Sequence, residues 1–119
     1  MTGYAASVIP VEIQALRERA AKLVGWLPEG MRCHEVARAV GEVLGLPVVD
    51  GRYGCVNHSW LVVDGYILDV YCVGRLPLVQ VVDMSPTLPH RSDYQEGTAR
   101  GDIDHAAVAS AIGTWRRTT

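Results

Sequence analysis

The chain has 119 residues, and 49% of them are hydrophobic, which is enough material for one domain with a proper core. Its formal net charge is −2, from 11 basic and 13 acidic residues without any block of like charge. This balance argues against nucleic acid or an anionic membrane surface as a partner. The longest apolar runs fall far short of the roughly 20 residues that span a bilayer. We therefore expect a single soluble domain over residues 1–119.

The N-terminus and the cysteines bear on the cellular compartment. The first residues lack the basic start and the apolar stretch of a signal peptide. The three cysteines are an odd number and show no Cys-x-x-Cys spacing, which argues against both a disulfide framework and a zinc ribbon. We expect a cytoplasmic protein with at least one free thiol.

Two helices are predicted at the start of the chain. Apolar residues recur at intervals of three and four from Ile9 to Leu27, and the following Pro-Glu-Gly stretch ends that helix. A second helix is predicted from about Met31 to Leu44, and Gly45 ends it as a C-cap. Cys33 then lies in its first turn, on the apolar face.

The other side of this second helix carries polar residues. Glu35, Arg38 and Glu42 point away from the apolar stripe, and His34 is predicted to be solvated. We expect these four side chains to lie outside the core.

The middle of the chain changes to the pattern of strands, with branched and aromatic residues between turns. Asp64-Gly65 is the strongest short hairpin signal in the sequence. In chain order the sequence predicts an extended piece at Pro47–Val49, a turn at Asp50-Gly51, and strands at Arg52–Val63, Tyr66–Val73 and Leu78–Val82.

The end of the chain is predicted to hold a long loop and a last helix. Asp83 to Gly101 contains two prolines and no periodicity, so it is expected to be either a lid or a connector. Asp102 is the predicted cap of a helix from Ile103 to Arg116. The fold class is therefore α+β, with two N-terminal helices, an antiparallel sheet of about four strands and a C-terminal helix.

The hairpin register brings a histidine and an aspartate together. If Asp64-Gly65 closes a two-residue turn, Trp60 lies opposite Asp69, and His58 and Asp69 become diagonal neighbours on one face. A three-residue turn would shift the register by one and place them on opposite faces. Buried ionisable groups need partners, so we expect His58 and Asp69 to interact.

Cys33 is the candidate third member of this group. It projects from the apolar face of a helix that must pack on the sheet, and we expect that to be the face carrying His58 and Asp69. A helix N-terminus and a neighbouring imidazolium both stabilise a thiolate. Cys33, His58 and Asp69 would then act as nucleophile, base and orienting residue.

This order resembles the transglutaminase-like branch of the papain-like thiol enzymes. The matching stretches are Met31–Ala37, with the cysteine on a helix, then Asn57–Gly65 and Ile67–Val70. His58-Ser59-Trp60 is similar to the His-Ala-Trp motif of that family, and Leu68-Asp69-Val70 to its aspartate strand. Small bacterial peptidases that trim lasso-peptide leaders are similar as well. The resemblance covers roughly residues 28–83 and implies a papain-like core with a cysteine peptidase or amidase activity.

Two features of the family are missing from this chain. No tryptophan follows Cys33, and no upstream glutamine element supplies an oxyanion donor, so the oxyanion would be held mainly by backbone N–H groups, including that of Cys33. The expected function is hydrolysis of a peptide or amide bond through a thioester. Deamidation and amine transfer use the same intermediate, and a binding module that keeps the fold without activity is the alternative from another class.

Further residues have open alternatives. Tyr53, Asn57 and Trp60 are candidates for contacts with a peptide or protein substrate. Cys55 and Cys72 are diagonal neighbours on the opposite face, where a disulfide is geometrically possible. Zinc bound by Cys33, His58 and another thiol is a weaker alternative, because Cys55 and Cys72 point away from His58. No cofactor or metal is expected, and the oligomeric state stays open.

Overall fold

A computed structural model describes residues 9–27, 30–71, 80–83, 94–98 and 101–118. It has the α+β architecture, with strands in the order β4-β3-β2-β1-β5 and every pair antiparallel. The described residues form five strands, in line with the antiparallel sheet of about four strands that we expected. The elements are α1 (Val11–Val24), α2 (Cys33–Leu44), β1 (Val48–Tyr53), β2 (Val56–Val63), β3 (Tyr66–Asp69), β4 (Gln80–Asp83), β5 (Tyr94–Glu96) and α3 (His105–Thr118).

The two N-terminal helices form where the sequence predicts them. Pro10 precedes α1, where its missing N–H costs no helical hydrogen bond. Gly45 ends α2 in the left-handed conformation with φ of 73°, and the N–H of Leu46 donates to the carbonyl of Gly41 at 2.8 Å. That turn lets the chain leave α2 toward β1.

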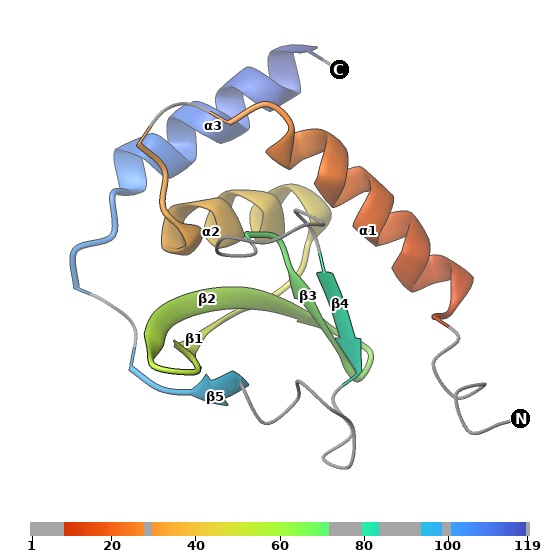
Figure 1. Ribbon diagram of the computed structural model, residues 1–119. Coiled ribbons are helices and arrows are strands. Elements are labelled where there is room, and N and C mark those ends of the chain that lie inside the picture. The colour runs from red at the N-terminus through yellow and green to blue at the C-terminus, as the bar shows by residue number, and fades with distance from the viewer. Residues whose placement is uncertain (1–8, 28–29, 72–79, 84–93, 99–100, 119) are drawn as a thin grey trace, which may run out of the picture.

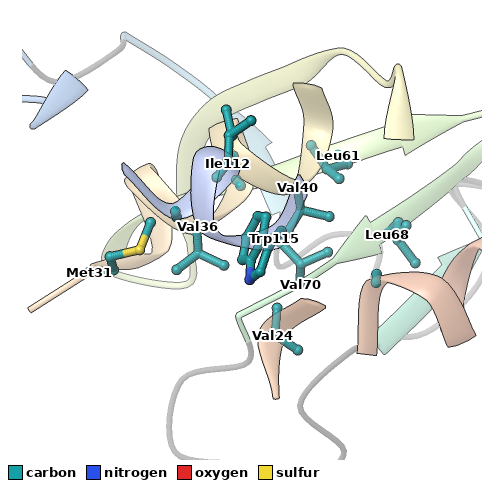
Figure 2. Packing of buried hydrophobic residues seen from close by; sticks show 13 residues of the cluster. Val24, Met31, Val36, Val40, Leu61, Leu68, Val70, Ile112 and Trp115 are labelled. Carbon is teal, nitrogen blue, oxygen red and sulfur yellow. The ribbon is translucent and has the colours of Figure 1, made fainter. Parts of the chain in front are cut away.

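Helix α2 is the centre of the molecule, with the sheet on one side and α1 and α3 on the other (Figure 1). Figure 2 shows that apolar side chains from the three helices and from β2 and β3 point toward one another around it. Removing this apolar area from water is the main term that holds the layers together. The labelled members of this core are Val24, Met31, Val36, Val40, Leu61, Leu68, Val70, Ile112 and Trp115.

The Asp64-Gly65 turn has the two-residue length that the register argument needed. Asp64 and Gly65 have φ angles of 46° and 81°, as a hairpin turn matched to the sheet twist requires. Val63 pairs with Tyr66, and Leu61 pairs with Leu68. The predicted register is confirmed.

The helix nevertheless packs on the other face of this hairpin. Leu61 and Leu68 belong to the core around α2, whereas Trp60 and Ile67 lie in a second apolar group with Tyr94. Side chains alternate along a strand, so His58 shares the face of Trp60, and the prediction that α2 packs on the face of His58 was wrong. Both faces of β2 are apolar, so alternation did not tell which one the helix covers.

The predicted turn at Asp50-Gly51 was also wrong. These residues lie inside β1, and the chain turns at Gly54, which has a φ of 60°. A Cβ at Gly51 would overlap the backbone carbonyl of Gln95 in β5. Gly51 therefore allows the close approach of a neighbouring strand, which is the other common use of glycine in a sheet.

The C-terminal part differs from prediction at two points. The region expected to be a loop contains β5, which adds to the edge of the sheet beside β1. The cap of α3 is Asp104, whose Oδ1 accepts the N–H of Ala107 at 3.0 Å, and not Asp102. Asp102 instead accepts a hydrogen bond from Arg32 at 3.1 Å. Among the described helices, none has the length and apolar character needed to cross a membrane.

Candidate active site

Cys33 is the first residue of α2, at the place where the helix approaches the beginning of β2. Figure 1 shows β2 curving beneath this end of the helix. The side chain is 7% exposed, and its Sγ lies 3.9 Å from the backbone carbonyl oxygen of Asn57. The thiol therefore reaches the start of β2 next to His58, although the body of α2 packs on the opposite face.

His58 and Asp69 make the contact that the register predicts. Nε2 of His58 lies 2.8 Å from Oδ2 and 3.0 Å from Oδ1 of Asp69, and the two residues are 1% and 2% exposed. The N–H of Tyr71 donates a further hydrogen bond to Oδ1 at 3.2 Å. A carboxylate only accepts, so the proton on Nε2 is fixed and Nδ1 is the nitrogen left for chemistry.

The Nδ1 atom of His58 is buried, and it makes no hydrogen bond of ordinary geometry with the residues that the structure describes. The Cys33 thiol is nevertheless close enough to influence the ring. Burial alone lowers the pKa of His58, but the hydrogen bond to Asp69 and its charge, and then the nearby Cys33 thiol, outweigh it and raise the pKa to about 9. The ring is therefore an imidazolium at neutral pH, and its free N–H is on Nδ1.

Tyr94 is a fourth member of the site that the sequence analysis missed. It lies in β5, is buried, and donates its hydroxyl to Oδ2 of Asp69 at 2.7 Å. Its ring packs against those of Tyr53 and Trp60, with centroids 4.9 and 5.1 Å away. A strand of three residues inside a polar stretch shows no periodicity, so the sequence pattern does not predict β5. The only signal in the sequence was that a tyrosine hydroxyl can donate a hydrogen bond to a buried carboxylate.

The three predicted substrate contacts lie around the site but differ in exposure. The side chain of Asn57 is exposed, and its backbone carbonyl faces Cys33. Tyr53 is half-buried with its ring centroid 6.0 Å from that of His58. Trp60 is 2% exposed and packs beneath His58, so it offers little surface to a substrate. Contact of these residues with a substrate stays a prediction.

The start of α2 is held by a buried carboxylate. Glu35 was expected outside the core, but its side chain is 1% exposed, accepting the backbone N–H of Arg32 at 3.0 Å and the guanidinium at 2.6 Å. The N–H of Asp104 also donates to it at 3.1 Å. Burial by itself raises the pKa of Glu35, but these hydrogen bonds, with that of the Arg32 side chain largest, lower it to about 2. Glu35 thus joins the first turn of α2 to the start of α3.

The prediction of a solvated His34 was wrong as well. His34 is 4% exposed, and its Nδ1 lies 2.8 Å from Oγ of Ser59. Arg38 is partly buried and donates to Asp50 at 2.8 Å. His34 and Arg38 therefore face β1 and β2, whereas Glu42 is exposed as expected.

Within the described part of the chain, no group of three or more histidine, cysteine or acidic residues is arranged to hold a metal ion. Cys55 is exposed and reduced, and Cys72, its suggested disulfide partner, lies outside the described residues. Comparisons of the chain with protein-family models, with curated proteins and with solved structures found no match. The geometry of the site is therefore the basis for the function proposed below.

Proposed function

We propose that the protein is a thiol-dependent hydrolase that cleaves a peptide or amide bond with Cys33, His58 and Asp69. The observation that carries the proposal is that the two ring nitrogens of His58 have different surroundings. Nε2 is committed to Asp69 at 2.8 Å, the buried Nδ1 makes no ordinary hydrogen bond with the described residues, and the Cys33 thiol is close enough to influence the ring. Covalent acyl transfer by a thiol uses three groups in this order, a nucleophile, a base and a residue that orients the base.

The raised pKa of His58 indicates how the thiol is activated. We propose that the proton on the ring comes from the Cys33 thiol, so that the nucleophile is a thiolate beside an imidazolium. Cys33 Sγ attacks the carbonyl carbon of the substrate and forms a C–S bond. The C–N bond then breaks, and the leaving amine takes the proton from Nδ1 of His58.

The second half of the reaction restores the enzyme. His58, now neutral, takes a proton from water through Nδ1, and the resulting hydroxide attacks the thioester carbon. The C–S bond breaks, the acid product leaves, and the proton on His58 again pairs with the Cys33 thiolate. If ammonia leaves in the first half the same cycle is a deamidation, and if an amine replaces water it is a transamidation.

The backbone at the start of α2 is suited to hold the oxyanion. The first N–H groups of a helix have no partner within the helix, and they carry its positive end. The N–H of Cys33 is one of these groups by position. Its use as an oxyanion donor fits a chain in which no upstream glutamine element is found.

The likeness of residues 28–83 to the transglutaminase-like thiol enzymes agrees with this proposal. In both, a helix cysteine precedes a strand histidine and an aspartate on the next strand. We infer a papain-like core, a peptide or protein as substrate, and a cytoplasmic location in which the thiols stay reduced.

Competitive alkylation tests the proposal. Cys55 is exposed and Cys33 is 7% exposed, so accessibility alone predicts that iodoacetamide modifies Cys55 first. Activation by His58 predicts the reverse at about pH 6, where ordinary thiols are protonated. Peptide mapping by mass spectrometry gives both rates in one sample, and His58→Ala should abolish the preference for Cys33.

A binding module that keeps the fold without activity is the alternative. The low exposure of Cys33 favours it, since a thiol of this kind is often a small core residue. Slow alkylation of Cys33 at every pH, unchanged by His58→Ala, would support that module and contradict the hydrolase.

A further inference from the structure

A closed ring of hydrogen bonds lies between α2 and the sheet, on the face opposite His58. Nδ1 of His34 lies 2.8 Å from Oγ of Ser59, which donates to Oδ1 of Asp50 at 2.6 Å. Arg38 donates to Oδ2 of Asp50 at 2.8 Å and to the backbone carbonyl of His34 at 3.0 Å, which completes the ring. The ring joins α2 to β1 and β2 at once.

The proton positions in this ring are determined by its chemistry. A guanidinium only donates and an ionised carboxylate only accepts, so the Ser59 hydroxyl gives its one proton to Asp50. Its oxygen is then left to accept, and Nδ1 of His34 must carry a proton. Every bond in the ring therefore has one direction.

The ring involves the residues that follow the nucleophile and the base. His34 is next to Cys33 in α2, and Ser59 is next to His58 in β2. Because neighbouring side chains on a strand point to opposite faces, Ser59 can bind α2 on one face of the sheet while His58 stays with Asp69 on the other. A bond between His34 and Ser59 therefore sets the distance between the backbones that carry Cys33 and His58.

We propose that His34 and Ser59 are positioning residues for the Cys33–His58 pair, with Asp50 and Arg38 holding them in place. This inference rests on the proposed function. The thiol and Nδ1 of His58 make no hydrogen bond of ordinary geometry, so their separation depends on the scaffold. Proton sharing and nucleophilic attack lose rate steeply when groups move by about 1 Å. The ring supplies the rigid support that such a pair requires.

A ring that only stabilises the fold would behave differently from one that positions the pair. Loss of a buried hydrogen bond lowers the free energy of unfolding in either case. Only a positioning role changes how the reactivity of Cys33 depends on pH in protein that is still folded. The ratio of the alkylation rate at about pH 6 to that at about pH 9.5 measures this, because an ordinary thiol is ionised only at the higher pH.

The test compares four variants with the wild-type chain by alkylation of Cys33 with iodoacetamide and mass spectrometry. Ser59→Ala and His34→Leu remove the bond, and we expect each to lower the rate ratio of Cys33 about tenfold or more, equal to a change of one pKa unit in the pair. His34→Asn keeps an N–H donor near Nδ1 and should retain most of the ratio. Trp115→Phe removes a hydrogen bond from α3 to the Trp26 carbonyl, which is not part of the ring or of the site, and should leave the ratio unchanged.

Three outcomes decide the inference. If wild-type Cys33 has the ratio of an ordinary thiol, the proposed function fails. If the wild-type ratio is high and Ser59→Ala keeps it, the function stands and the positioning role is overturned. If Ser59→Ala and His34→Leu do not fold, Arg38→Gln replaces them, because it opens the partly exposed side of the ring. A rate ratio of Cys33 in Arg38→Gln equal to the wild-type value would overturn the inference, and a reduced ratio supports it.

Discussion

Nε2 of His58 lies 2.8 Å from Oδ2 of Asp69, although the two residues are diagonal and not directly opposite on β2 and β3. Their contact depends on the two-residue turn at Asp64-Gly65, because one more residue in that turn would move them to opposite faces. The contact is enclosed by Tyr94 and Trp60, so the carboxylate acts on the ring with little screening by water.

Replacing Asp69 with asparagine should remove the activation of Cys33. The hydrogen bond that His58 donates to Asp69 is the largest influence that raises the pKa of His58, and without it burial lowers that pKa. We expect the alkylation rate of Cys33 at about pH 6 to fall about tenfold for each pKa unit lost, and hydrolysis to fall on the order of 10²-fold or more. Asp64→Asn, the same change at the exposed turn of this hairpin, is the control and should have no effect.

Replacing Tyr94 with phenylalanine should mainly affect stability. The variant loses one hydrogen bond to a buried carboxylate, at 2.7 Å, while His58 and the N–H of Tyr71 still bind Asp69. The free energy of unfolding should fall by about 2 kcal/mol, measured by urea denaturation. Tyr66→Phe on β3 is the matched control. An equal decrease in its free energy of unfolding would show that the Tyr94–Asp69 hydrogen bond makes no particular contribution to stability.

The stability of the protein should decrease as the pH rises from about 6.5 to about 9. The folded state keeps a proton on His58 up to about pH 9, whereas the unfolded chain loses it near the ordinary value of 6.5. This contribution of the imidazolium is therefore complete below pH 6.5 and is lost as pH rises through the folded value. It amounts to about 3 kcal/mol at most, and a Cys33 thiolate reduces it, because the proton on His58 then comes from the Cys33 thiol. Urea denaturation at both ends of this range measures it. In His58→Gln this part of the pH dependence should be absent, and an equal decrease in that variant would contradict the assignment.

The loss of stability at acidic pH should depend on a different group, the carboxyl of Glu35. Glu35 has a pKa lowered to about 2, so its contribution is complete above its ordinary value of 4.5 and is lost as pH falls toward 2. Glu35→Gln should therefore flatten the stability curve below about pH 4.5 and leave it unchanged between pH 6.5 and 9. A variant with the same acid transition as the wild-type chain would show that another carboxyl is responsible.

Short-range signals accounted for much of the fold and of the site. The apolar spacing located α1 and α2, and Gly45 located the end of α2. The Asp64-Gly65 pair gave the hairpin its register, and the register brought His58 to Asp69. All of these features depend on contacts between residues that are close in sequence, which periodicity and turn chemistry describe well.

The features that were missed depend on contacts between distant segments. Gly51 looked like a turn residue because nothing local shows that β5 will pass over it. His34 and Glu35 looked solvated because their partners, Ser59 and the N–H of Asp104, come from elsewhere in the chain. Burial of a polar residue is decided by the tertiary partner that satisfies it, and such partners are not visible in a local pattern.

Titration of His58 in the wild-type chain and in Cys33→Ser shows whether the ring and the thiol share a proton. The ring carbon-bound protons of His58 report its charge by NMR as the pH is raised. We expect His58 to titrate near pH 9 in the wild-type chain and at a clearly lower pH in Cys33→Ser, because the thiolate contributes to holding the proton on the ring. An identical titration in both chains would show that Cys33 and His58 do not share a proton, and would contradict the catalytic pair.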